Sequence, residues 1–187
     1  DTPWSGNGSN KLYLSSGQFT STVKISVNVN SADASPEDIS WDGTNILWCG
    51  SSADKMFLQS GSFTSTIKTS HIIQSIDDHI TGISSESSGS GEITIWCGSE
   101  ADKLYVSSGQ FASTIKTSQY IGDIDTHPRD ISWDGFNSPW CGVEANKLYL
   151  QSGQYSTTLK TSQTVAASHR PEGISWSGTD TLYAATP

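Results

Sequence analysis

The sequence predicts an all-β protein built from tandem repeats, and three observations support this class. Four short blocks rich in β-forming residues recur along the chain at spacings of 44, 48 and 44 residues. Serine-glycine and aspartate-glycine pairs, which are typical of tight turns, separate the blocks. No segment shows the 3.6-residue periodicity of an amphipathic helix.

Each repeat contains four predicted strands, named A to D in their order within a repeat. Strand A carries an Ile-Ser-Trp motif, strand B a Trp-Cys-Gly motif, strand C a Lys-Leu-Tyr-Leu motif and strand D a Ser-Thr-Ile-Lys motif. The C blocks are Lys11–Leu14, Lys55–Leu58, Lys103–Val106 and Lys147–Leu150, and the D blocks are Phe19–Lys24, Phe63–Lys68, Phe111–Lys116 and Tyr155–Lys160. The A blocks are Ile39–Gly43, Ile131–Gly135, Ile174–Gly178 and a degraded copy at Ile83–Ser85, and the B blocks are Trp48–Gly50, Trp96–Gly98 and Trp140–Gly142.

The connections between these strands favour a small β-propeller. The A-B, B-C and C-D connections are short, whereas the D-to-A connection is long and often holds a proline. A propeller needs this pattern, because the chain must return from the outer edge of one blade to the axis of the next. We therefore expect one domain, residues 1–187, that forms a four-bladed propeller of four-stranded antiparallel blades. The repeats are residues 1–38, 39–82, 83–130 and 131–173, with closing strands in 174–187.

The same motifs resemble the blade repeats of the β-propeller superfamily. The shared features are Gly-Ile-Ser-Trp, a turn with Gly-Thr, an aromatic strand, and Asn or Asp before Lys-Leu-Tyr. The resemblance covers essentially the whole chain and matches no particular family. It implies an architecture and no function, because propellers include binding proteins, enzymes and scaffolds.

The strand count predicts a mismatch at the ends of the chain. The order is B, C, D, then three complete repeats, then A and B, which gives 17 strands where four closed blades need 16. If the final A strand completes the first blade, Trp4 and Tyr183 compete for one B position. We expect the displaced strand to pair with another copy, through Asp1–Gly6 or Thr181–Thr186, or the chain to continue into further repeats.

Composition excludes several classes of partner. Ten basic and 19 acidic residues give a net charge of −9, which argues against nucleic acid and against adsorption to an anionic membrane. No run of 18 apolar residues exists, so no membrane insertion is expected. The chain begins Asp1-Thr2-Pro3-Trp4, so we expect a removed targeting segment or a longer parent chain. The Asn7 glycosylation sequon and the acidic, Ser/Thr-rich composition favour an extracellular or cell-surface protein.

The three cysteines occupy one repeat position and predict neither a disulfide nor a metal centre. Equivalent residues of successive repeats do not lie within bonding distance. The corresponding residues in the remaining B strands are Ser5 and Ala184, which are not ligands of a soft metal. We expect buried packing groups.

Aromatic and amide side chains are the candidate ligand-binding residues. Tryptophans at one repeat position are most often inter-blade core, but a set left partly open offers flat faces to sugar rings, with amides binding the hydroxyls. The candidates are Trp41, Trp133, Trp176, Gln18, Gln110, Gln154, Asn45 and Asn137.

Other repeated polar residues have structural interpretations. Eight lysines fall at two repeat positions, and those in strand D protect the outer edge of the sheet from pairing. His79, His127 and His169 lie in the long connections, where an anion or metal role has only weak support.

The sequence predicts no catalytic residue, no cofactor and no metal site. Near-identical repeats supply copies of one weak site, whereas catalysis usually needs one asymmetric constellation. The leading hypothesis is a non-enzymatic extracellular binding or adhesion module, lectin-like, with one weak glycan site per blade. The rival hypothesis is a structural subunit that assembles into a fibre or appendage through its extra terminal strand.

Overall fold

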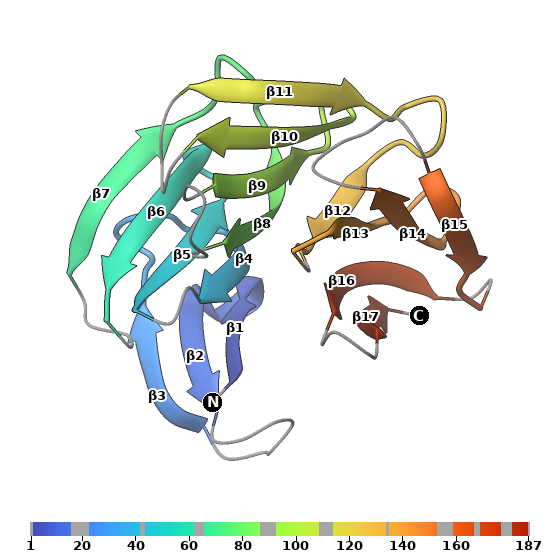
Figure 1. The fold of residues 1–187 in the computed structure, drawn as a ribbon. Helices are drawn as coiled ribbons and strands as arrows, with labels where there is room; N and C mark the ends of the chain where they lie inside the picture. The colour runs from blue at the N-terminus through green and yellow to red at the C-terminus, as the bar shows by residue number, and fades with distance from the viewer. Residues whose placement is uncertain are drawn as a thin grey trace.

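The computed structural model describes residues 2–15, 23–41, 44–61, 66–86, 93–108, 114–133, 135–152, 159–166, 169–176 and 181–186 (Figure 1). It contains 17 strands in the order expected from the repeats. Their bounds are β1 Thr2–Gly6, β2 Lys11–Ser15, β3 Val23–Asn28, β4 Pro36–Trp41, β5 Asn45–Gly50, β6 Lys55–Ser60, β7 Ile67–Ile72, β8 Ile80–Glu86, β9 Ile93–Gly98, β10 Lys103–Ser108, β11 Ile115–Tyr120, β12 Pro128–Ile131, β13 Asn137–Gly142, β14 Lys147–Ser152, β15 Leu159–Thr164, β16 Arg170–Trp176 and β17 Thr181–Thr186. Within the described residues the only helix is the 3₁₀ turn η1, Asn7–Ser9.

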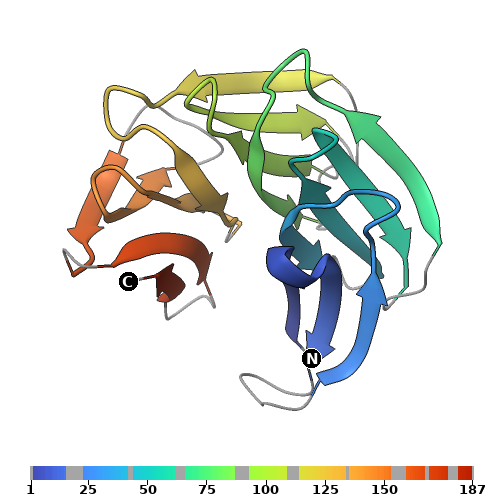
Figure 2. The same cartoon turned by 180° about the vertical axis from the view of Figure 1, so that it is seen from behind.

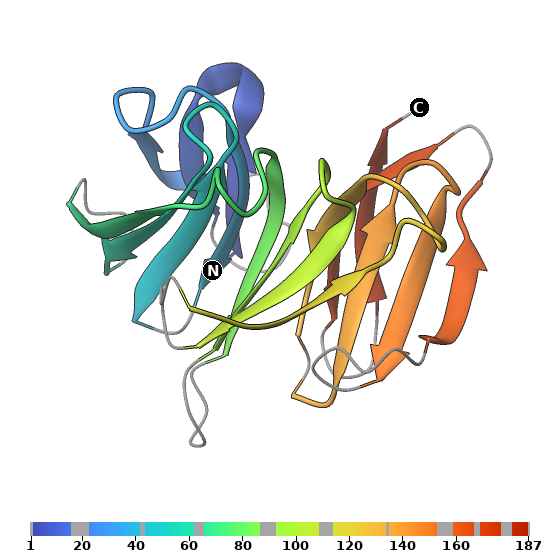
Figure 3. The ribbon, with the colours of Figure 1, turned by 90° about the horizontal axis from the view of Figure 1, so that it is seen from above.

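The strands form successive antiparallel sheets around a central axis, which confirms the predicted all-β, four-bladed propeller. Strands β4–β7, β8–β11 and β12–β15 form complete four-stranded blades, and β1–β3 form a three-stranded blade. Figures 1 and 2 show the A strands β4, β8, β12 and β16 nearest the axis and the D strands on the outside. Seen from above, the blades stand side by side with their faces packed together (Figure 3).

The expected closure between the two ends of the chain does not form. Strand β16 pairs with β17 in a two-stranded sheet, with Ile174 opposite Tyr183. Within the described residues it does not pair with β1, whose ladder partner is β2. Trp4 and Tyr183 therefore do not compete for one position. The reason is local: the chain enters β17 directly from β16, and the register of this hairpin repeats the A-B register of the complete blades.

Each blade presents an aromatic face to the preceding blade and an aliphatic face to the following one. In the second blade, Trp48 stacks on Phe57 with ring centroids 3.9 Å apart. Both rings pack against Leu12 and Leu14 of the first blade. Because side chains alternate along a strand, the neighbouring residues face the third blade. The pairs Trp96–Tyr105 and Trp140–Tyr149 repeat this arrangement at the next two junctions.

A buried aspartate ties each of the first three long connections to the next blade. The Asp77 carboxylate accepts hydrogen bonds from the backbone N–H groups of Glu100 and Ala101 and from the Tyr105 hydroxyl. A Cβ at Gly98 would lie 2.2 Å from Asp77 Cγ, so the glycine of the Trp-Cys-Gly motif makes room for the carboxylate. Equivalent bonds involve Asp33 with Ser52 and Ala53, and Asp125 with Glu144, Ala145 and Tyr149.

The residue before each C strand adopts a left-handed conformation. Its φ is 53° at Asn10, 47° at Asp54, 49° at Asp102 and 51° at Asn146. Asn and Asp tolerate this region better than other non-glycine residues, which explains the repeated Asn/Asp-Lys pair.

None of the described helical segments has the length and apolar character needed to cross a bilayer.

Candidate functional site

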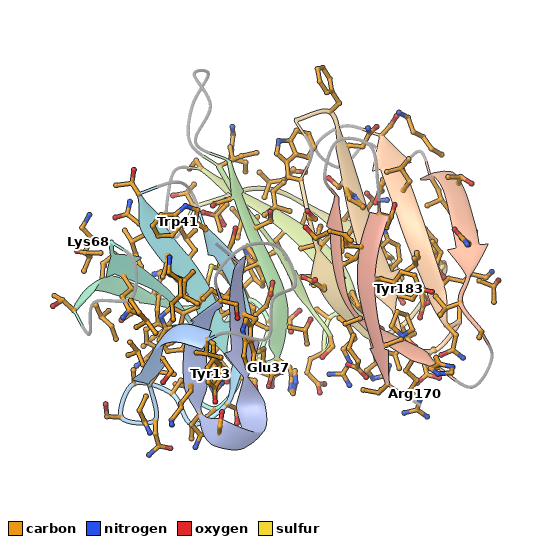
Figure 4. All side chains as sticks on the ribbon, turned by 90° about the horizontal axis from the view of Figure 1, so that it is seen from below. Tyr13, Glu37, Trp41, Lys68, Arg170 and Tyr183 are labelled. Carbon is orange, nitrogen blue, oxygen red and sulfur yellow. The ribbon has the colours of Figure 1, made fainter. Side chains whose placement is uncertain are left out.

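The A strands surround a cavity of about 680 Å³ on the propeller axis. Strands β4, β8, β12 and β16 each supply lining residues, and β1 and β17 add residues at the two ends of the ring. In Figure 4, Glu37 and Trp41 mark the two ends of β4, and Tyr183 of β17 lies across from them. The cavity volume is in the range of ligand-binding clefts.

Carboxylates and glycines alternate on successive A strands. The same repeat position holds Asp38 in β4, Gly82 in β8, Asp130 in β12 and Gly173 in β16. A Cβ at Gly82 would lie 2.7 Å from the Asp130 Cα. The glycine is therefore required for the close approach of the neighbouring strand and its carboxyl group.

Both carboxyl groups tie neighbouring blades together. Asp38 Oδ2 accepts a hydrogen bond of 2.7 Å from the Ile83 N–H in the next A strand. Asp130 Oδ2 accepts one of 2.6 Å from the Ile174 N–H, again in the next A strand, and its Oδ1 accepts the Ile131 N–H. The oxygens thus satisfy inner-strand N–H groups that would otherwise be left without partners.

The two aspartates are also hydrogen-bonded to each other. Burial raises the pKa of Asp38 to about 6, while the hydrogen bonds from Ile83 and Asp130 oppose this increase. Burial and the charge of Asp38 raise the pKa of Asp130 well above its usual value. Asp130 is consequently the member that keeps the proton and donates it to Asp38.

Hydroxyl groups and two tryptophans, Trp4 and Trp41, complete the lining. Ser40, Ser84, Ser132 and Ser175 occupy the position two residues beyond the Asp/Gly position of each A strand and line the cavity. Ser40 Oγ lies 3.4 Å from Ser85 Oγ in the neighbouring blade. The Trp41 side chain lines the same cavity and is 39% exposed.

The three cysteines are free and buried behind this lining, as predicted. Burial raises the pKa of each thiol well above its usual value. Cys97 Sγ lies 3.4 Å from Thr81 Oγ1. A protonated, inaccessible thiol is a poor nucleophile, so these residues contribute packing.

The two tryptophan sets have different roles. The B-strand residues Trp48, Trp96 and Trp140 are fully buried and form inter-blade core. In the A-strand set, Trp133 packs partly buried against the core between the third and fourth blades, whereas Trp41 lines the axial cavity. Trp176 is in β16, but its side chain lies outside the described residues.

Asn45 and Asn137, the two amide candidates that the structure describes, form hydrogen bonds within their own blades. Asn45 accepts a hydrogen bond from Lys68 Nζ at 3.0 Å, and Asn137 accepts one from Lys160 Nζ at 2.6 Å. Each pair links strands B and D of one blade. The three glutamines, Gln18, Gln110 and Gln154, lie outside the described residues, as does the Asn7 side chain.

The lysines and histidines lie away from the cavity. The D-strand lysines Lys24, Lys68, Lys116 and Lys160 are exposed on outer edge strands, as expected. His127 Nδ1 lies 3.7 Å from Glu144 in an exposed pair. Within the described ranges, no group of three or more His, Cys, Asp or Glu residues is arranged to hold a metal ion.

No protein-family model matches this sequence, and no curated protein is similar to it in sequence. Among solved structures, the chain is similar to a catalytically inactive virginiamycin B lyase from Staphylococcus aureus with quinupristin, at 14% identity and a TM-score of 0.66. That alignment covers 97% of this chain and 58% of the lyase chain. The selenomethionine-substituted lyase gives 16% identity, a TM-score of 0.62 and coverage of 96% and 57%.

A chain in a nidogen/laminin complex gives 15% identity and a TM-score of 0.63, with 95% of this chain and 68% of that chain covered. This chain thus spans somewhat over half the length of the lyase chains. The similar structures include an enzyme, and at this level of identity they show the propeller fold.

Proposed function

We propose that this protein is a non-enzymatic extracellular binding module whose axial cavity takes a neutral carbohydrate. The observation that carries the proposal is the half-exposed Trp41 ring in a cavity of about 680 Å³ whose rim repeats one serine per A strand. An aromatic face packs against the C–H groups of a sugar, and serine hydroxyls both donate to and accept from sugar hydroxyls. The net charge of −9 disfavours an acidic ligand.

The chemistry of the cavity supports binding over catalysis. Both buried carboxyl groups are engaged by backbone N–H groups of the next blade. The thiols behind the lining are protonated and inaccessible. The carboxyl groups of Asp38 and Asp130 are therefore committed to holding the blades together.

We infer one axial site in place of one site per blade. Trp133 packs against the core, and Asn45 and Asn137 bond to lysines within their own blades. Of the two candidate tryptophans whose side chains are described, Trp41 is therefore the one that lines the cavity.

A glycan array, followed by calorimetry with the ligand that it identifies, tests the proposal. Trp41→Ala should weaken binding at least about tenfold, the usual effect of removing a central aromatic contact, and leave the melting temperature nearly unchanged. Phe136→Ala is the matched control, because Phe136 is 80% exposed and does not line the cavity. Absence of glycan binding, or equal effects of both variants, would overturn the carbohydrate assignment. Cleavage of the bound glycan, followed by NMR, would overturn the non-enzymatic assignment.

A further inference from the structure

The three internal blade junctions define what covers each face of a blade. At every junction, a stacked aromatic pair from strands B and C packs on the aliphatic face of the preceding blade. The B-strand tryptophans at these junctions are 0% exposed and the C-strand aromatic residues are 2–3% exposed. Burial of two aromatic rings is a major stabilising contribution at such a contact.

The first blade has the same aromatic face, but no blade among the described residues packs over it. Trp4 stacks on Tyr13 with ring centroids 3.9 Å apart and an interplanar angle of 9°, as in the other blades. Trp4 is nevertheless 40% exposed. The side chain is already ordered by this stack and by a hydrogen bond from Trp4 Nε1 to Ser15 Oγ, so little conformational entropy remains to be lost when a partner covers it.

The fourth blade has the complementary aliphatic face. A cavity of about 160 Å³ is lined by Leu148, Leu150 and Ile174 among others. Leu150 is half-buried, whereas its equivalents Leu14, Leu58 and Val106 are buried under the aromatic pair of the following blade.

Strand β17 holds the B position beside this face without filling it. Its residues are mostly exposed, with Leu182 at 39% and Tyr183 at 52%. The B strands β5 and β9 are buried along their whole length. We infer that β17 is displaced more readily than β5 or β9, because each of those B strands also pairs with a C strand of its own blade.

The hydrogen-bond partner of the C-strand tyrosine differs between the internal junctions and the two ends of the chain. At two of the three internal junctions, the C-strand tyrosine donates to the aspartate of the preceding connection, and at the first junction the equivalent residue is Phe57. The aspartate lies six residues before the isoleucine of the following A strand, as Asp33 and Asp125 do. In the last connection this sequence position is Ser168. Correspondingly, the Tyr13 hydroxyl of the first blade lies 2.7 Å from Ser9 Oγ in its own turn. The first blade thus needs no carboxylate from a preceding connection, and the last connection offers none.

We propose that the aromatic face of β1–β3 packs on the aliphatic face of the fourth blade in a second copy of this chain, where β1 replaces β17 beside β16. This head-to-tail contact continues the interface that already joins the blades within one chain. Strand β16 then supplies the A strand that the first blade of the other copy lacks. The Trp4–Tyr13 pair fills the 160 Å³ cavity, and each contact leaves one aromatic and one aliphatic face for the next copy.

Light scattering of the full chain over a range of concentrations tests the contact. We expect a mass above the 20.0 kDa of one chain. Trp4→Ala should weaken association at least about tenfold, whereas Phe136→Ala should not. Deletion of residues 1–6 should abolish association, and deletion of residues 181–187 should strengthen it by vacating the B position. Circular dichroism should show native strand content in each variant.

Cross-linking identifies the faces independently of the fold of any one variant. Within the chain, the contact between the first two blades pairs Leu14 with Trp48, and the equivalent pair between copies is Leu150 with Trp4. A mixture of Trp4→Cys and Leu150→Cys chains, at concentrations raised more than about tenfold to offset the loss of the Trp4 ring, should yield disulfide-linked pairs of the two different variants. A mixture with Phe136→Cys at the same concentrations should not. A mass of one chain at every concentration would overturn the proposal. So would loss of association on deleting residues 181–187, because β17 would then be the bridging strand.

Discussion

The aspartate pair at the axis makes the stability of the propeller depend on pH, and Asp38→Asn tests this. The pKa of Asp38 rises from 3.8 to about 6 on folding. Between these values the folded chain binds more protons than the unfolded chain, so stability is greatest below about pH 4 and falls as the pH rises through 6. A pKa increase of this size corresponds to about 3 kcal/mol of unfolding free energy, at about 1.4 kcal/mol for each pKa unit.

Asparagine at position 38 can still accept the Ile83 N–H and can donate to Asp130 without titrating. Loss of the Asp38 charge also lowers the pKa of Asp130, of which that charge is the second cause of elevation. Both effects make the unfolding free energy of the variant less dependent on pH than that of the parent chain. From pH 4 to pH 7, the variant should therefore lose about 2 to 3 kcal/mol less unfolding free energy than the parent chain.

Urea unfolding at several pH values, followed by tryptophan fluorescence, measures this difference. The slope of unfolding free energy against pH is compared between the two chains, because a destabilisation by the substitution that is the same at every pH does not change this slope. Asp123→Asn controls for the loss of one exposed carboxylate. Identical slopes for the parent and Asp38→Asn would refute the buried, hydrogen-bonded pair.

Three further predictions concern the blade junctions. Gly98→Ala should cost about 1 to 3 kcal/mol of unfolding free energy, because its Cβ would lie 2.2 Å from Asp77 Cγ; an unchanged melting temperature would contradict the tight contact. Tyr149→Phe removes a 2.9 Å hydrogen bond to Asp125 and should cost about 1 kcal/mol in denaturant titration; a cost near zero would mean that water replaces the hydroxyl. The three thiols should resist alkylation in the folded protein and react after unfolding, as followed by mass spectrometry; rapid native labelling would show that they are accessible. They are Cys49, Cys97 and Cys141.

The repeats allowed most of the fold to be predicted, because one strand assignment could be checked against its copies. The order of all 17 strands and the outer position of the lysine strands follow from this agreement. The end of the chain could not be predicted in the same way. The last A strand, β16, could pair with either of two B strands, β1 or β17. Sequence periodicity does not say which of the two takes the position beside it.

The axial site was harder to predict. Asp38 and Asp130 belong to non-adjacent repeats, and only the curvature of the ring brings them together. The alternation with Gly82 and Gly173 was visible in the sequence and was the signal that could have identified the pair. The tryptophans were ambiguous for a different reason, since neighbouring side chains decide whether an aromatic residue at a repeat position is core or lining.

The buried aspartate in each of the first three long connections has a consequence for how the chain folds during synthesis. Each carboxylate precedes the backbone N–H groups that it binds, by 20 residues from Asp33 to Ala53, 24 from Asp77 to Ala101 and 20 from Asp125 to Ala145. At about 5 to 20 residues per second, a ribosome needs about 1 to 5 s to deliver the partner turn. During that interval the aspartate and the aliphatic face beside it are open to water. Each blade of the nascent chain therefore acquires its stable form only when the next blade arrives, and folding follows translation one repeat behind.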